Sequence, residues 1–128
     1  MNPAEIRLRI PHAKPYHGVA RLVVGGLAAR IDLSYEHLDD LQLALASVLE
    51  NEHYTADAEV TVELLVREDA VAVVIGPLNG SKLRADLDRA DGNGITLGRL
   101  LRTVVEAVVV EEREDGVWLR LEKHASMP

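Results

Sequence analysis

The chain has 128 residues, of which 48% are hydrophobic, and its 14 basic and 21 acidic side chains give a formal net charge of −7. This length suffices for one domain with its own hydrophobic core, so we expect a single domain over residues 1–128. The negative charge argues against direct binding of nucleic acid, and the absence of cysteine excludes disulfides and thiolate metal sites. Neither a signal peptide nor a membrane-spanning apolar run is visible, which predicts a cytoplasmic protein with no membrane partner.

The apolar pattern predicts strands and helices in a fixed order along the chain. Strands are expected at residues 5–10, 59–68, 71–75, 107–112 and 117–123, from alternating or continuous apolar residues. Helices are expected over residues 17–31, from Ser34 to Asn51 and over 96–105, where apolar residues recur at helical spacing. In the first helix the apolar positions are Val19, Val23, Leu27 and Ile31.

Residues 76–95 are rich in glycine and read as a long excursion between a strand and the last helix. Long loops in compact domains are usually functional or mobile. The stretch "RADLDRAD" within it mixes both charges at helical spacing, which is typical of a solvated helix or a mobile lid.

The strands indicate a sheet with one covered and one wetter face. With the three helices on the covered face, the predicted fold is a two-layer α/β sandwich with a mixed, mostly antiparallel five-stranded sheet.

Three sequence motifs follow one another along the chain. They are a helix that ends in Asn51 after "DDLQLALASVLE", a strand followed by Gly-Pro in "VVIGP", and a glycine-rich turn that opens a helix in "DGNGITLGRLL". This arrangement resembles the histidine-kinase-like ATPase fold and, within it, the small anti-sigma factors that are also serine-protein kinases. The likeness runs from residue 5 to about residue 123. It implies ATP and Mg²⁺ as cofactors, a sigma factor or anti-anti-sigma factor as protein partner, and a role in transcription regulation.

The resemblance also implies a nucleotide site. Asn51 would help to hold Mg²⁺ on the phosphates, a role that suits an amide oxygen because Mg²⁺ is a hard ion that takes oxygen ligands. Gly76, Gly92, Gly94 and Gly98 would provide the glycines of the nucleotide-binding motifs, whose backbone N–H groups cradle phosphates. The alternative is that Asn51 only caps a helix and that the glycines form an ordinary surface turn.

Five positions depart from the family pattern. Ser47 stands where the family has the glutamate that acts as general base, and a serine cannot accept that proton without a base of its own. Val74 replaces the aspartate that contacts adenine, Leu78 replaces a glycine, and Val117 replaces a threonine near the last strand. Thr96 replaces a further glycine and would be strained if that position required a positive φ. We therefore expect no catalytic residue and a degenerate site in which ATP binding is weakened or lost.

Three functional hypotheses follow. The first is an anti-sigma-factor-like regulator that acts by protein binding. The second is an active, ATP-dependent protein-serine kinase in which another carboxylate acts as base, with Glu50 the first to test. The third is a protein whose likeness to the family is only architectural, which a third helix on the opposite side of the sheet would favour. A homodimer is a further expectation, because family members commonly pair and residues 5–10 can form a free sheet edge.

Two other features carry weaker expectations. Trp118 shares a strand face with Arg120 and Glu122, so we expect it on the open face of the sheet as a contact residue. His12 and His17 flank a proline-containing turn, and no third metal ligand is evident beside them, so we expect exposed loop histidines.

Overall fold

The computed structural model describes residues 4–31, 33–51, 58–89 and 96–124. The elements in chain order are β1 (Ala4–Pro11), α1 (Lys14–Ala28) continued by the 3-10 turn η1 (Ala29–Ile31), α2 (Tyr35–Leu49), β2 (Glu59–Val66), β3 (Ala70–Leu78), α3 (Gly80–Asp88), α4 (Leu97–Val104), β4 (Ala107–Arg113) and β5 (Gly116–His124). Among the helices of the described residues, none has the length and apolar character needed to cross a membrane.

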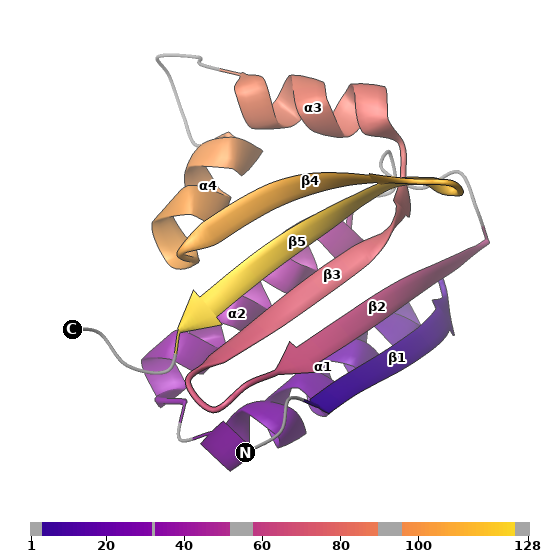
Figure 1. Cartoon of the computed structure of the whole chain (residues 1–128). Coiled ribbons are helices and arrows are strands. Elements are labelled where there is room, and N and C mark those ends of the chain that lie inside the picture. The colour runs from indigo at the N-terminus through magenta and orange to yellow at the C-terminus, as the bar shows by residue number, and fades with distance from the viewer. Residues whose placement is uncertain (1–3, 32, 52–57, 90–95, 125–128) are drawn as a thin grey trace.

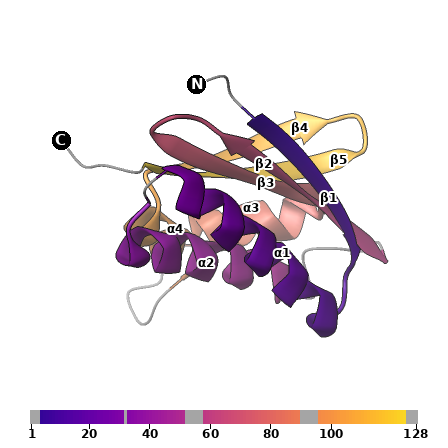
Figure 2. The ribbon, with the colours of Figure 1, turned by 90° about the horizontal axis from the view of Figure 1, so that it is seen from below.

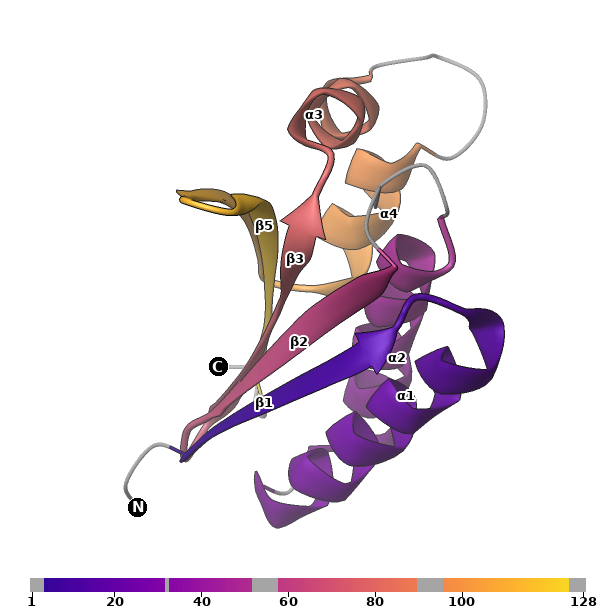
Figure 3. The same cartoon turned by 90° about the vertical axis from the view of Figure 1, so that its right-hand side faces the viewer.

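The five strands form one sheet in the order β1-β2-β3-β5-β4, and each neighbouring pair is antiparallel (Figure 1). All neighbouring pairs of the described strands are thus antiparallel, whereas the prediction was a mixed, mostly antiparallel sheet. Helices α1, α2 and α4 lie on one face of it, as Figures 2 and 3 show from two further directions. Because α2 packs against both α1 and α4, the third predicted helix is on the same side as the others. The two-layer α/β sandwich is confirmed.

The core is aliphatic and lies between the sheet and the helices. Alternate residues of β2 and β3 point into it, as the period of a strand requires. The central positions of the core are Val62, Leu64, Val73, Leu45 and Leu119, all fully buried. The opposite face of the sheet carries the intervening residues of each strand.

The buried face of α1 differs from the predicted one. Its buried residues are His17, Ala20, Val24 and Ala28. Of the predicted positions, Ile31 is buried in η1, Val23 and Leu27 pack half-buried against the core, and Val19 is 41% exposed. The sequence pattern favoured the larger residues one position away. The small Ala20 and Ala28 side chains allow the helix to lie close to the sheet, which outweighs the larger apolar area of Val19.

The predicted excursion over residues 76–95 is wrong for its first half. Strand β3 continues to Leu78, and α3 follows with Asn79 as its N-cap, whose Oδ1 accepts a hydrogen bond from the Lys82 N–H at 3.3 Å. Leu83 and Leu87 bury themselves in the core at helical spacing. The stretch "RADLDRAD" is therefore helical as far as Asp88, while residues 90–95 lie outside the described part of the chain.

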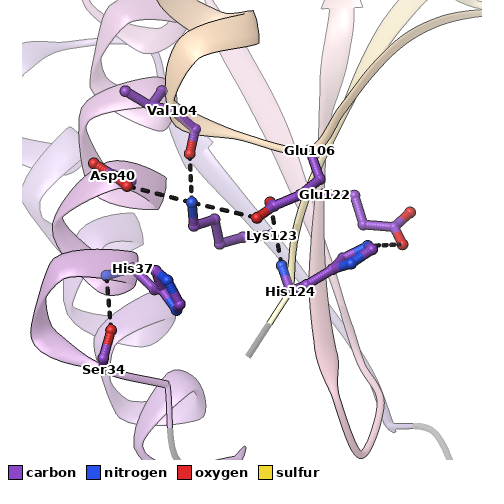
Figure 4. A network of polar contacts seen from close by, with 8 residues as sticks. All are labelled: Ser34, His37, Asp40, Val104, Glu106, Glu122, Lys123 and His124. Carbon is purple, nitrogen blue, oxygen red and sulfur yellow. Dashed lines mark hydrogen bonds and ion pairs between the residues drawn. The ribbon is translucent and has the colours of Figure 1, made fainter. Parts of the chain in front are cut away.

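A buried lysine ties the two layers together at one end of the sheet (Figure 4). Lys123 of β5 is 5% exposed. Its Nζ donates to the Val104 carbonyl at 2.8 Å and lies 3.3 Å from an Asp40 carboxylate oxygen and 3.5 Å from Glu106. The amine therefore joins β5 to α2 and to the end of α4, and the two carboxylates offset the desolvation of its charge.

A tryptophan lies flat on the outer face of the sheet. The absent side chain of Gly76 makes room for the Trp118 ring, since a Cβ there would overlap the indole. The Arg113 guanidinium covers the ring at 4.1 Å from its centroid and donates two hydrogen bonds of 3.0 Å to Glu63. These bonds to Glu63 raise the pKa of Arg113 above its usual range. Trp118 is only 1% exposed, so the expectation of an exposed contact residue is wrong, although its face of the sheet is the predicted one.

Gly76→Ala tests the packing of this ring. The added methyl has to displace the indole, so we expect the free energy of unfolding to fall by about 1–3 kcal/mol. Gly26→Ala is the matched control, because Gly26 sits in α1 with open space around it; there we expect a gain of about 0.5–1 kcal/mol. Urea unfolding followed by the fluorescence of Trp118 measures both, and an undisturbed Gly76→Ala variant would contradict this packing.

Lys123→Met tests the link between the layers. It leaves the buried Val104 carbonyl without its donor, so we expect a loss of about 1–3 kcal/mol in the free energy of unfolding. Lys82→Met is the control, because that amine is 3.6 Å from Asp86 on the exposed side of α3, and a change within about 0.5 kcal/mol is expected. Equal effects of the two substitutions would show that the buried network contributes no more than a surface pair.

Candidate nucleotide-binding site

Helix α2 positions the residues of the predicted site. Ser34 caps its first turn by accepting a hydrogen bond from the His37 N–H at 3.1 Å. The buried stripe of Leu41, Leu45 and Val48 then fixes the rotation of the helix about its axis. Asn51 follows the C-cap residue Glu50 and is half-buried, and its N–H donates to the Val48 carbonyl at 3.3 Å. Its role as a magnesium ligand stays a prediction.

Ser47 lies one turn before Asn51 and is occupied within its own helix. Its hydroxyl donates to the Leu43 carbonyl at 2.7 Å, the usual back-bond of a serine in a helix. A hydroxyl held this way has no basic partner in that bond, so it offers no route for removing a proton from a substrate. Asp40 lies two turns before Ser47 in α2, and a carboxylate oxygen of Asp40 is 3.3 Å from the Lys123 Nζ.

Gly76 and its neighbour Val74 lie on the outer face of the sheet, away from α2. Val73 and Ile75 point into the core, so Val74, between them, points to the other side. It is paired with Glu63 on one strand and Arg120 on the other. The structure thus does not bring Val74 or Gly76 together with Ser47 and Asn51, which belong to the helix layer.

Gly98 lies in the helix layer, near the start of α4. It is buried, and a Cβ there would overlap the carbonyl oxygen of Leu87 at the end of α3. Close packing of two helices is thus sufficient to require this glycine. Gly92 and Gly94 lie outside the described residues, so their role in phosphate binding stays a prediction.

Three of the departures from the family pattern have a structural reason. Thr96 is the N-cap of α4, where its hydroxyl accepts a hydrogen bond from the Arg99 N–H at 3.3 Å. Its φ of −89° is ordinary for threonine, so the expected strain is absent. Leu78 and Val117 face one another across β3 and β5, and both are buried in the core. The two positions now pack apolar surface.

The two histidines near the start of α1 are not the exposed loop residues expected. His17 is buried, with 6% of its surface exposed. The centroid of its ring is 5.2 Å from that of His12, whose Nε2 lies 2.9 Å from the Leu49 carbonyl in the last turn of α2. Sequence reasoning missed this contact with the helix end that carries Asn51. The signal was present, because His17 continues the spacing of Ala20, Val24 and Ala28.

A cavity of about 710 Å³ opens on the outer face of the sheet, on the side away from α2. Its lining includes Arg7, Thr61, Pro77 and Trp118. The arginines at its β1 wall are already paired, Arg7 with Glu63 at 3.2 Å and Arg9 with Glu59 at 3.0 Å. No feature of the sequence pointed to this cavity, because its walls come from strands far apart in the chain.

No family model matches this chain. Curated proteins do match it, and several of them carry the name serine-protein kinase RsbW. The protein of Bacillus pumilus is 32% identical over 59% of this chain and 51% of its own length, and that of Listeria monocytogenes is 35% identical over 54% and 47%. In these two matches the chain spans about half the length of the relative. The protein of Halalkalibacterium halodurans is 26% identical over 94% of this chain and 83% of its own length.

The matches agree with the resemblance drawn from the order of the motifs. They come from several organisms and carry one name. The resemblance of this chain to the family of anti-sigma serine-protein kinases is therefore confirmed.

Proposed function

We propose that this protein is an anti-sigma-factor-like regulator that acts by binding a protein partner, with ATP binding and kinase activity weakened or lost. The partner is a sigma factor or an anti-anti-sigma factor, and the protein acts as one domain in the cytoplasm. The observation that carries the proposal is Ser47. The position at which the family has its general base holds a hydroxyl bonded to the Leu43 carbonyl, within a fold that is otherwise retained.

The surroundings of the site support the same proposal. Gly76 and Gly98 each have a packing role that requires no nucleotide, beside Trp118 and Leu87 respectively. Leu78 and Val117 add apolar contacts where the family pattern has smaller or hydroxyl-bearing residues. The residues at positions 78 and 117 therefore preserve the packing of the sandwich, and they lack the backbone or hydroxyl contact that a nucleotide would use there.

ATP and Mg²⁺ are the cofactors to test, and Asn51 is the residue that we expect to contact Mg²⁺. An amide oxygen at the end of α2 fits Mg²⁺, which takes oxygen ligands and usually keeps several waters. When bound, the ion would neutralise phosphate charge. With Asn51 as the contact and no carboxylate at Ser47, the chain retains a means of holding a nucleotide weakly and no evident means of activating a hydroxyl.

The alternative is an active ATP-dependent protein-serine kinase with a displaced base. Glu50 adjoins Asn51 at the end of α2 and is exposed, so its carboxylate is free to approach a substrate hydroxyl. It points in a different direction from Asn51, because adjacent positions of a helix do not face the same way. Glu50→Gln decides this version, which fails if measured phosphotransfer survives the substitution.

A homodimer is part of the proposal. β1 is an edge strand that pairs only with β2 within the described sheet, and its eight residues leave one row of backbone groups unpaired. Such an edge is a template for pairing with another strand. Direct nucleic-acid binding is not proposed, since the chain carries a net charge of −7.

Calorimetric titration with ATP and MgCl₂ tests the loss of nucleotide binding. We expect no heat of binding up to millimolar ATP, for the wild type and for Asn51→Ala alike. The control is Asn79→Ala, which removes an amide that caps α3 and has no part in the predicted site. Micromolar binding that Asn51→Ala abolishes and Asn79→Ala preserves would contradict the proposal and favour the active kinase.

A further inference from the structure

His17 is a buried histidine that makes no hydrogen bond within the described chain. Its side chain sits in α1 with 6% exposure, and neither Nδ1 nor Nε2 has a partner. Buried polar atoms are nearly always paired, because an unpaired one costs about 1–3 kcal/mol. Such an imidazole is tolerated in its neutral form, since a positive charge would add a larger desolvation cost. The closed arrangement therefore disfavours a proton on His17.

The ring lies where three elements meet. His12, in the turn between β1 and α1, has its ring centroid 5.2 Å from that of His17. The Nε2 of His12 lies 2.9 Å from the Leu49 carbonyl and, as an N–H, donates to it, while its backbone N–H donates to the Ala58 carbonyl at 2.7 Å. The pair therefore joins the start of α1 to the last turn of α2 and to the residue that precedes β2.

The charges around His17 do not compensate a proton on it. Burial lowers the pKa of His17, the neighbouring His12 lowers it further, and Glu50 at the end of α2 opposes the shift. These two are the titratable groups whose charge acts on His17 among the described residues. Glu50 is exposed, so solvent screens its attraction.

We infer that His17, His12 and the last turn of α2 form a proton-sensitive latch, which opens at mildly acidic pH and releases the helix end that carries Asn51. A proton on His17 is disfavoured in the closed contact. The ring has to reach water, and to do so it parts from His12 and the end of α2. The opening itself is independent of any ligand; its effect on a nucleotide or partner held near Asn51 rests on the proposed function.

The direction of the pH dependence follows from the lowered pKa. The folded-state pKa of His17 lies below 6.5, the value of an unperturbed histidine. The open state therefore binds the proton more tightly than the closed one. The latch is closed above pH 6.5. As the pH falls below 6.5, the ratio of closed to open states decreases, by up to about tenfold per pH unit.

Amide hydrogen exchange, measured by NMR at about pH 7.5 and about pH 5.5 and corrected for the intrinsic exchange rate, tests the latch. The reporters are the amides of His12 and Glu50, which donate to the Ala58 and Ala46 carbonyls. In the wild type we expect their protection to fall at the lower pH, by up to about tenfold. In His17→Phe, which fills the site without titrating, we expect a fall of less than about twofold, and His17→Gln serves as a second non-titrating variant should the phenylalanine disturb folding.

Two comparisons make the result specific. His124→Phe removes a histidine whose side chain is 47% exposed at the end of β5 and must leave the wild-type pH response intact. The amide of Val73, in the centre of the sheet, reports global unfolding, so the amides of His12 and Glu50 must be less protected than it at both pH values, as a local opening requires. Equal losses in wild type and both His17 variants, or amides of His12 and Glu50 that are as protected as that of Val73, would overturn the inference. Since no nucleotide is present, failure of the ATP titration and failure of the latch are separate results.

Discussion

The burial of one face of α2 against the sheet is the interaction on which the rest of the structure depends. Leu41, Leu45 and Val48 are fully buried in the core. They fix the helix about its axis, and by doing so they place Ser47 and Asn51 at its edge. Burying each such side chain stabilises the fold by about 1.5–3 kcal/mol. The packing of these three residues therefore also sets the positions of the residues beside them on the helix. A change in the chemistry of Ser47 or Asn51 is thus possible without loss of the fold.

Glycines illustrate how the same residue can serve packing where a family pattern suggests a ligand. Gly76 accepts the face of Trp118 on the outer side of the sheet, and Gly98 accepts the end of α3 against α4. In both cases the need for a missing side chain arises from a protein neighbour. These packing reasons for the two glycines hold whether or not ATP is bound, so the glycines alone do not decide whether the site binds a nucleotide.

Much of the fold could be predicted because strand and helix periods differ and the chain keeps them apart. The alternation of β1 and β2 and the helical spacing of the apolar residues of α2 were sufficient for their placement, and the order of the motifs predicted the resemblance that the curated matches bear out. A solvated helix was one of the two expectations for this stretch, but the burial of α3 was not predicted, because charged residues surround its two buried leucines. The burial of Trp118 escaped because its cover, the Arg113–Glu63 pair, joins residues 50 positions apart. The face of α1 was misjudged because Ala20 and Ala28 bury less apolar area than Val19 and yet fit more closely.

The residues of the candidate site stay a prediction, and their arrangement in space could be read only from the structure. Ser47 and Asn51 share a helix, so their spacing decides their proximity. Gly76 and Val74 lie on a strand whose neighbours Val73 and Ile75 face the core, and only the pairing of the sheet reveals that they point away from α2. His12 and His17 come together through a turn that the sequence marks only by its prolines.

The most direct measurement of the central claim is the affinity of this protein for the sigma factor of its own organism, by calorimetry, with and without ATP and MgCl₂. A regulator that acts by binding alone should form the complex without nucleotide, with a dissociation constant that changes by less than about twofold when ATP is added. Binding that appears only with ATP and Mg²⁺, and that Asn51→Ala abolishes, would contradict the account and return the site to nucleotide chemistry.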